Sequence, residues 1–196
     1  MLLLVLGLVL FLGVHSVRVV ADGWRTATVA RIGALPWKGL FSVLSVAGFV
    51  LLAWGYGQAR QQPVVLWNPP AGMRHATALL MLPVFVLFVA AYVPRNGIKA
   101  RLQHPQILSV KLWALAHLLS NGTLADVVLF GAFLVWAVVD FRAARRRGGP
   151  SPQPSPQGGE GGTATGTVIC VVAGLVLYGV FAFWLHGPLI GVRPFG

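Results

Sequence analysis

Six long apolar runs, separated by short polar segments, constrain the fold of this chain more than any other feature. The runs cover residues 2–20, 39–56, 76–93, 105–119, 122–141 and 167–185. A helix needs about 20 apolar residues to cross the hydrocarbon core of a membrane, and all runs but the fourth are close to that length. Because lipid offers open backbone groups no partner, the runs predict helices, and their continuity excludes the alternating strands of a membrane barrel. We therefore predict an all-α fold, a polytopic transmembrane helical bundle with about six spans.

The composition supports a membrane protein and excludes several other classes. Apolar residues make up 57% of the 196 residues and charged residues 10%, against about 45–50% and about 25% in soluble domains. The mean hydropathy is +0.78. These values exclude an ordinary soluble domain and a disordered chain, and the single cysteine, Cys170, excludes an internal disulfide. Six spans use most of the length, so no large soluble domain is expected.

The first and fourth runs differ from a plain span. The first lacks the positively charged start and the small-residue cleavage site of a signal peptide, and it carries His15 and Arg18 near its end. It is therefore interpreted as a retained span. The fourth run has about 15 residues and contains Lys111, so we expect neighbouring helices to shield it from lipid.

The basic residues predict how the chain is oriented in the membrane. The net charge is +11. One side of the predicted topology holds most of the Lys and Arg residues, namely Arg18, Arg25, Arg31, Lys38, Arg95, Lys99, Arg101, Arg142, Arg145, Arg146 and Arg147. The other side holds Arg60, Arg74 and Arg193. Since cytoplasmic loops carry the excess of Lys and Arg, both termini are predicted to lie outside the cytoplasm. The charge is thus assigned to topology and anionic lipid rather than to nucleic acid, because no basic stretch is interleaved with aromatic residues on a soluble face.

The stretch 148–166 differs in composition from the spans on either side of it. It is rich in Gly, Pro, Ser and Gln, as in PSPQPSPQGGEGG. Such a stretch cannot bury enough apolar surface to offset the entropy of ordering it, so we predict a disordered cytoplasmic linker. The predicted organisation is residues 1–147 with the first five spans, residues 148–166 as linker, and residues 167–196 with the sixth span and a tail.

Histidines are the main ionisable residues within the predicted spans. His15, in the first span, either bonds to a backbone carbonyl or ligates a metal or haem. On the fourth run, His104 and His117 point about 140° apart, so the two do not readily bind one metal together. His104 precedes Pro105 and is expected near the cytoplasmic headgroups. His117 lies deeper, one turn after Trp113, and is the better ligand candidate.

The remaining polar residues have simpler interpretations. Lys111 is expected to pair with Asp126 across the short loop between the fourth and fifth spans, which would offset the burial of both charges. His75 and His186 fall at span ends, where interfacial histidines are common. His104, Lys111 and Asp126 are kept as further candidate site residues.

The motifs that the sequence lacks leave serine-nucleophile, zinc-hydrolase and nucleotide-driven reactions without support. CxxC, HExxH, GxSxG, GxGxxG and P-loop motifs are absent from it. With one histidine in each of two spans and few acids, the residues favour a haem with two imidazole ligands. A non-haem metal would need more oxygen or sulfur ligands than the spans offer.

Several segments of the chain resemble the bacterial NnrU family. They are LGVHSVRV, KGLFSVLSVAGFVLLAWGYGQAR, LWNPPAGMRHATALLMLP, IKARLQHPQILSVKLWALAHLLSNGTLADVVLFGAFLVWAVVD and FWLHGPLIGVRP. The most specific part is the HPQ…KLWALAHLL…NG block, and the resemblance covers nearly the whole chain outside the linker. It implies a multi-pass protein of the bacterial inner membrane, associated with nitrite and nitric oxide metabolism.

The NnrU family is similar to the zeta-carotene isomerases of plants and cyanobacteria. That similarity implies a haem b held by two membrane histidines, which match His15 and His117 here. The isomerases also have a cysteine three residues before the second ligand, where this chain has Ala114, and an arginine before the HP pair, where it has Gln103. The departure at Ala114 weakens the expectation of isomerase-type ligand switching and leaves haem binding open.

Two functions from different classes follow. In the first, haem b binds between the first and fourth spans, with His15 and His117 as axial ligands and Trp113 and Asn121 as pocket neighbours. The protein would then be a redox or nitrogen-oxide-linked factor, or would isomerise an apolar polyene, with a polyene or a redox protein as its partner. In the second, the histidines are structural, and the protein is a non-catalytic assembly or interaction factor for a respiratory complex. Membrane methyltransferases resemble only the HP-containing block and are a weaker hypothesis.

Overall fold

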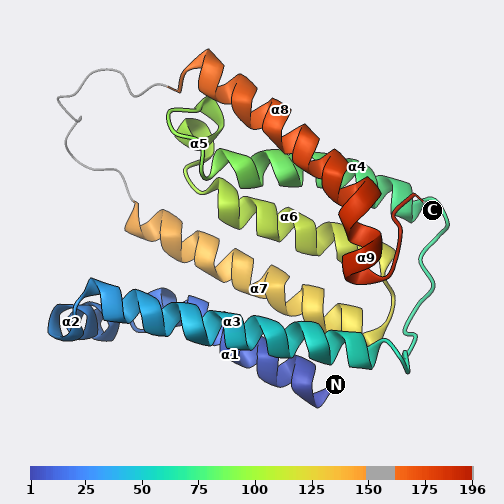
Figure 1. Ribbon diagram of the computed structural model, residues 1–196, viewed down its shortest axis with the longest axis horizontal. Helices are drawn as coiled ribbons and strands as arrows, with labels where there is room; N and C mark the ends of the chain where they lie inside the picture. The colour runs from blue at the N-terminus through green and yellow to red at the C-terminus, as the bar shows by residue number, and fades with distance from the viewer. Residues whose placement is uncertain (149–161, 196) are drawn as a thin grey trace. The chain divides into compact units, whose positions relative to one another are not determined.

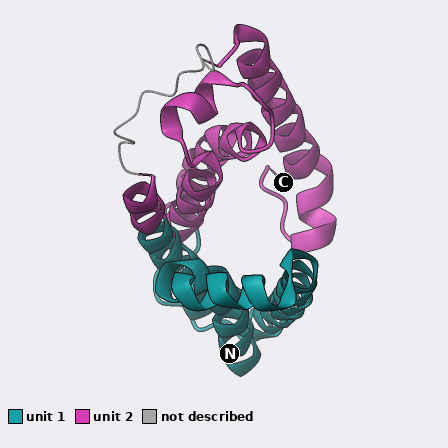
Figure 2. Cartoon of the chain, turned by 90° about the vertical axis from the view of Figure 1, so that its left-hand side faces the viewer, with its two compact units in different colours: residues 1–68, 121–140 teal, residues 69–120, 141–196 magenta. Residues whose placement is uncertain are grey.

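The computed structural model describes residues 1–148 and 162–195 and confirms the all-α fold (Figure 1). Within those residues, β structure is limited to two isolated bridges. The chain forms two units, shown in different colours in Figure 2. Unit 1 contains residues 1–68 and 121–140, and unit 2 contains residues 69–120 and 141–196. The predicted organisation into residues 1–147, 148–166 and 167–196 stays a prediction.

Among residues 1–148 and 162–195, five helices are long and apolar enough to cross a membrane. They are α1 (Leu2–Val20), α3 (Ala34–Ala59), α4 (Met73–Ala90), α7 (Leu124–Arg147) and the continuous helix that begins as α8 (Ala164–Val180). The predicted short fourth span is α6 (Pro105–Ser120), with 16 residues. Large apolar side chains are exposed along the long helices, for example Val43 at 67% and Val135 at 65%, as expected of faces that meet lipid. The chain is therefore a multi-pass membrane protein.

In unit 1, α1 and α3 pack closely because glycines of one helix face the backbone of the other. A Cβ atom at Gly48 would lie 2.8 Å from the backbone nitrogen of Phe11, and one at Gly55 would lie 2.7 Å from the Cα of Leu4. The contacts of residue 4 with 55 and of residue 11 with 48 make the two helices antiparallel. Small residues let membrane helices approach closely, and the dispersion attraction between the two close backbones stabilises the pair.

Unit 1 also contains the first part of α7, whose start is capped by the sequence TLAD. The Thr123 hydroxyl oxygen accepts from the backbone N–H of Asp126 at 3.3 Å. One Asp126 carboxylate oxygen accepts in return from the backbone N–H (3.0 Å) and hydroxyl (2.6 Å) of Thr123, which is a capping box. The other carboxylate oxygen accepts from the Tyr56 hydroxyl of α3 at 2.6 Å. This carboxylate therefore both caps α7 and connects it to α3.

In unit 2, α4 packs against both α6 and α8. A Cβ atom at Gly174 of α8 would lie 2.6 Å from the Cα of Val86, so the backbones of α8 and α4 approach closely. On the α6 side, the hydroxyl of Thr77 donates to the carbonyl of Ala116 at 2.8 Å. Pro83 lies inside α4 and has no N–H to donate, so one backbone hydrogen bond of the helix is missing. Membrane helices tolerate this loss where neighbouring helices pack against them.

Two helices lie in segments that the sequence predicts as loops. They are α2 (Asp22–Ile32) in unit 1 and α5 (Gly97–Leu102) in unit 2. α2 begins at an acidic residue, which suits the positive end of the helix dipole, and it is followed by Gly33, whose φ is +90°. α5 is capped by the Asn96 side chain, which accepts from a backbone N–H of the first turn at 2.7 Å. Neither helix has an apolar run long enough to stand out by hydropathy.

The sixth span begins earlier and ends later than predicted. The Thr163 hydroxyl oxygen accepts from the backbone N–H of Gly166 at 3.0 Å, and this cap lets α8 begin at Ala164. The predicted linker, 148–166, therefore extends too far by three residues, and its residues 149–161 lie outside the described residues. After α8 come a π-helical turn, η1 (Phe181–Leu185), and α9 (His186–Ile190).

Candidate ligand cavity and histidine sites

His15 lies near the end of α1, in an aromatic environment within unit 1. Its ring centroid is 4.3 Å from that of Phe11, 5.0 Å from that of Phe41 on α3 and 6.2 Å from that of Trp136 on α7. The Nδ1 atom lies 2.7 Å from the carbonyl oxygen of Phe11. Because a carbonyl oxygen only accepts, Nδ1 carries the hydrogen, and Nε2 of the neutral ring holds the lone pair. A neutral imidazole nitrogen of this kind is a common ligand of metals and haem iron.

A cavity of about 480 Å³ lies beside His15, between α1, α2 and α3 of unit 1. Its volume falls within the range of about 300–1,000 Å³ that is usual for small-molecule sites. Three cations line it, one from each helix: Arg18, Arg25 and Lys38. Apart from these residues, His15 and Ser42, the wall is apolar or aromatic. The cavity therefore combines a cationic lining with surfaces that suit an apolar group.

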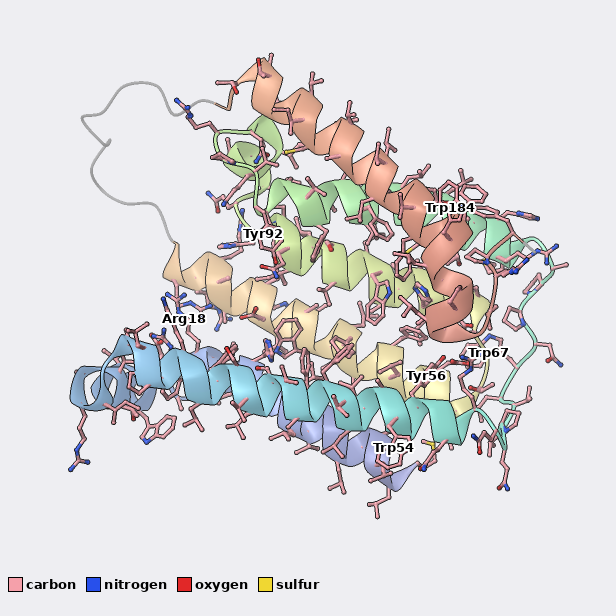
Figure 3. The ribbon with its side chains drawn as sticks, in the orientation of Figure 1. Arg18, Trp54, Tyr56, Trp67, Tyr92 and Trp184 are labelled. Carbon is pink, nitrogen blue, oxygen red and sulfur yellow. The ribbon has the colours of Figure 1, made fainter. Side chains whose placement is uncertain are left out.

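Two of the cations lie against neighbouring side chains. The Nε atom of Arg18, in the last turn of α1, is 3.9 Å from a carboxylate oxygen of Asp22, the first residue of α2. The guanidinium carbon of Arg25 is 6.0 Å from the ring centroid of Trp37, which is cation–π distance. In Figure 3, Arg18 is labelled at the end of unit 1 that holds α2, and Tyr56 is labelled toward the opposite end. The cationic residues of the cavity therefore gather at one end of unit 1.

Trp136, whose ring meets that of His15 edge-on, has a buried indole N–H. Among the residues that the structure describes, this N–H has no hydrogen-bond acceptor. An unmatched buried donor costs about 1–3 kcal/mol, so the surroundings of His15 favour a bound group that carries acceptor atoms.

His117 lies on α6 in unit 2 and has the same local arrangement as His15. Its Nδ1 atom is 2.9 Å from the carbonyl oxygen of Trp113, four residues earlier. The same argument gives Nδ1 the hydrogen, so Nε2 is the nitrogen that would ligate a metal if this histidine held one. The Trp113 ring centroid lies 5.4 Å from that of His117, so Trp113 is a direct neighbour of this histidine as predicted. Asn121, the other expected neighbour, belongs to unit 1, and its placement beside His117 stays a prediction.

The other candidate residues have partners within their own units. His104 directly precedes α6, as predicted, and its ring meets that of Phe141 edge-on at 6.2 Å. The Lys111 ammonium lies 5.7 Å from the centroid of the same Phe141 ring. Asp126 is engaged by Thr123 and Tyr56 in unit 1. Since Lys111 and Asp126 belong to different units, their pairing stays a prediction.

The histidines predicted at span ends lie where the sequence places them. His75 is exposed in the first turn of α4. His186 begins α9, and its Nδ1 lies 2.6 Å from the carbonyl oxygen of Val192. Both positions suit the interfacial interpretation.

Sequence reasoning missed Arg25, Lys38 and Trp136 as site residues. It counted Arg25 and Lys38 only as charges that set the topology, because the helix that carries Arg25 was interpreted as a loop. The helical spacing of Lys38 with Phe41 and Ser42 was a usable signal, since residues three or four apart share a face. No local signal brings Trp136 to His15, because the contact joins α1 to α7 across more than half of the chain.

Comparison with known proteins gives one match. The family model described as NnrU protein matches residues 3–194. No curated protein and no solved structure matches the chain. Because the family match spans nearly every residue, including both histidine motifs and the cavity helices, this multi-pass membrane protein belongs to the NnrU family.

Proposed function

We propose that this protein binds haem b in a bacterial inner membrane, with His15 and His117 as the residues that would hold the iron. The observation that carries the proposal is the arrangement that the two histidines share. Each donates Nδ1–H to the carbonyl four residues earlier, at 2.7 Å for His15 and 2.9 Å for His117. Such a hydrogen bond fixes the tautomer and the ring orientation of a ligating histidine. In both residues, Nε2 is the nitrogen that would hold the haem iron.

The surroundings of His15 fit a haem group better than a bare metal ion. Haem b combines a large apolar ring with two carboxylates, and the neighbouring cavity combines apolar and aromatic walls with three cations. The buried N–H of Trp136 adds a hydrogen-bond donor near the same histidine. In this role, His15 and His117 hold the iron, Phe41 and Phe11 exclude water, and Arg25 and Lys38 balance negative charge. The haem itself would supply one-electron chemistry or binding of a small ligand.

The proposal has two forms, which differ in the physiological role of the haem. In the first form, the protein performs a haem-dependent step linked to nitrite and nitric oxide metabolism. In the second form, it isomerises an apolar polyene. Ala114 supports the first form. It is fully buried one turn before His117, and it offers no thiolate as a second axial ligand. A purified protein whose haem spectrum responds to nitric oxide but not to cis-carotenes would support the first form, and the reverse response would support the second.

The experiment that tests haem binding is spectroscopy of the full chain, purified in detergent after expression with ample haem. We expect a Soret band, sharp α and β bands after reduction with dithionite, and a positive pyridine haemochrome assay. His117→Ala and His15→Ala should each lose the six-coordinate spectrum, and added imidazole should restore it in part. His75→Ala is the matched control, because His75 is exposed at a span end, and its spectrum should equal that of the wild type.

Two results would overturn the proposal. A six-coordinate spectrum that survives in the His117→Ala or His15→Ala variant would show that the residue is not a ligand. A colourless wild-type protein would remove haem binding altogether and favour the assembly or interaction factor, which should then co-purify with a respiratory complex. Size-exclusion chromatography of each variant separates loss of haem from loss of the fold.

A further inference from the structure

The cavity of unit 1 has two chemically different ends. Because α1 and α3 are antiparallel, Arg18 of α1 and Lys38 of α3 lie toward the end that α2 covers. His15 and Phe41 lie about one helical turn deeper, and their ring centroids are 5.0 Å apart. The outer end is therefore cationic, and the inner end is mainly aromatic and apolar.

The charges around the cavity are one-sided. Arg18, Arg25 and Lys38 line it, and none of the described lining residues carries a carboxylate. Asp22 is near, with a carboxylate oxygen 3.9 Å from Nε of Arg18, but it is not one of the residues that line the cavity. Three cations around about 480 Å³ at a membrane boundary repel one another, and an anion between them relieves that repulsion.

We propose that this cavity binds the anionic head of an amphiphile, a phosphate or carboxylate attached to an apolar body. Arg25 and Lys38 contact the anion, with Arg18 beside them, and the apolar body lies against Phe41 and Val14. Arginine suits this role because its planar guanidinium donates paired hydrogen bonds to phosphate or carboxylate oxygens. The volume suits a headgroup with the first part of its apolar body and excludes a whole phospholipid, whose chains would continue along the lipid-facing helix surfaces.

Two sources supply this chemistry, an anionic phospholipid and the propionates of haem. The second source rests on the proposed function, whereas the first does not.

The test uses a cavity variant, Arg25→Gln with Lys38→Gln, which removes two cations from the cavity and leaves the Arg18–Asp22 pair intact. Arg31→Gln with Arg101→Gln is the matched control. It removes the same charge from exposed residues of the same predicted membrane side, and neither residue lines the cavity.

The lipid arm uses native mass spectrometry of delipidated full-length protein with phosphatidylglycerol or phosphatidylcholine. We expect the wild type and the control to bind phosphatidylglycerol more tightly than phosphatidylcholine. The cavity variant should lose at least about tenfold in affinity for phosphatidylglycerol, the size expected for lost charge-assisted contacts. This result assigns the cavity to a lipid phosphate.

The haem arm measures haem retention and midpoint potential in the same proteins. If propionates occupy the cavity, the cavity variant should lose haem on dilution faster than the control, and its potential should fall. The potential falls because removing positive charge disfavours the added electron. Unchanged lipid affinity together with unchanged haem retention and potential would overturn the proposal. A colourless wild type removes only the haem arm, so failure of the proposed function and failure of the cavity proposal are distinguishable.

Discussion

At the scale of single residues, several polar side chains in the spans bond to the backbone of their own helix. His15 bonds to the carbonyl of Phe11, Ser16 donates to that of Leu12, and His117 bonds to that of Trp113. The hydrocarbon core offers no water, so a donor four residues after a carbonyl finds its partner there. This arrangement satisfies such a polar group within its own helix, and for a histidine it also fixes which ring nitrogen carries the hydrogen.

Among the polar residues, we expect substitution of Asn96 to lower the free energy of unfolding most. It is 2% exposed. Its amide donates to the carbonyls of Ala90 (2.9 Å) and Val93 (2.6 Å), and its oxygen accepts from the Lys99 N–H at 2.7 Å. Asn96→Ala leaves these backbone groups unmatched and removes the cap of α5. We expect a loss of about 2 kcal/mol and a fall in apparent Tm of about 5 °C in detergent, measured by differential scanning fluorimetry.

The control for this prediction is Gln106→Ala. Gln106 also makes a side-chain hydrogen bond, to the Tyr92 hydroxyl at 3.1 Å, but it is exposed. Exposed substitutions of this kind shift stability by less than about 0.5 kcal/mol. Equal Tm values for the two variants would mean that the buried cap contributes no more than a surface contact.

At the scale of elements, glycine decides which helix faces meet. Gly7, Gly48 and Gly55 line the contact of α1 with α3, and Gly174 lines that of α8 with α4. In lipid, apolar side chains gain little by leaving one apolar surface for another, so close backbone approach and dispersion attraction carry much of the association. The cavity lies beyond Gly48 toward α2, where bulkier residues of α1 and α3 face each other.

Gly55→Ala tests this packing directly. A Cβ atom at Gly55 would collide with the backbone of Leu4, so α1 and α3 must separate. Overpacking of this kind costs about 1–3 kcal/mol, and we expect the apparent Tm to fall by about 5 °C. Gly57→Ala is the matched control on the same helix, because a Cβ atom there meets nothing within 4 Å. Alanine also has the higher helix propensity, so that variant should be as stable as the wild type or more so. A similar loss in both variants would contradict the packing role of Gly55.

At the scale of the whole molecule, three of the basic residues that predict the membrane topology also line the cavity. Arg18, Arg25 and Lys38 contribute to the charge asymmetry that predicts topology, and they also line the cavity. A positively charged cytoplasmic loop is attracted to anionic lipid headgroups. When a positively charged segment folds as a helix over two spans, as α2 does, some of its charges turn inward toward the cavity.

The predicted orientation places the loop after α3 outside the cytoplasm and the end of α7 inside. Single cysteines introduced by Gln62→Cys and Gly148→Cys, each in a Cys170→Ala background, report on these sites, and both positions are exposed. With a membrane-impermeant maleimide, Gln62→Cys should label in intact spheroplasts and Gly148→Cys only after lysis, by the positive-inside rule. The opposite pattern would reverse the assigned topology, and labelling of both in intact cells would contradict the number of spans between them.

The sequence by itself determined the all-α membrane class, the positions of the long helices and membership of the NnrU family. Hydropathy depends on consecutive residues, and a family match depends on the order of residues along the chain. Neither requires knowledge of contacts between distant residues. Only the tertiary structure decided that α2 folds over α1 and α3 and that Arg25 and Lys38 share a cavity with His15. It alone also brought Trp136 to the same histidine. These features depend on which helix faces meet, and in lipid that choice is made by close packing between distant residues, which an apolar run does not encode.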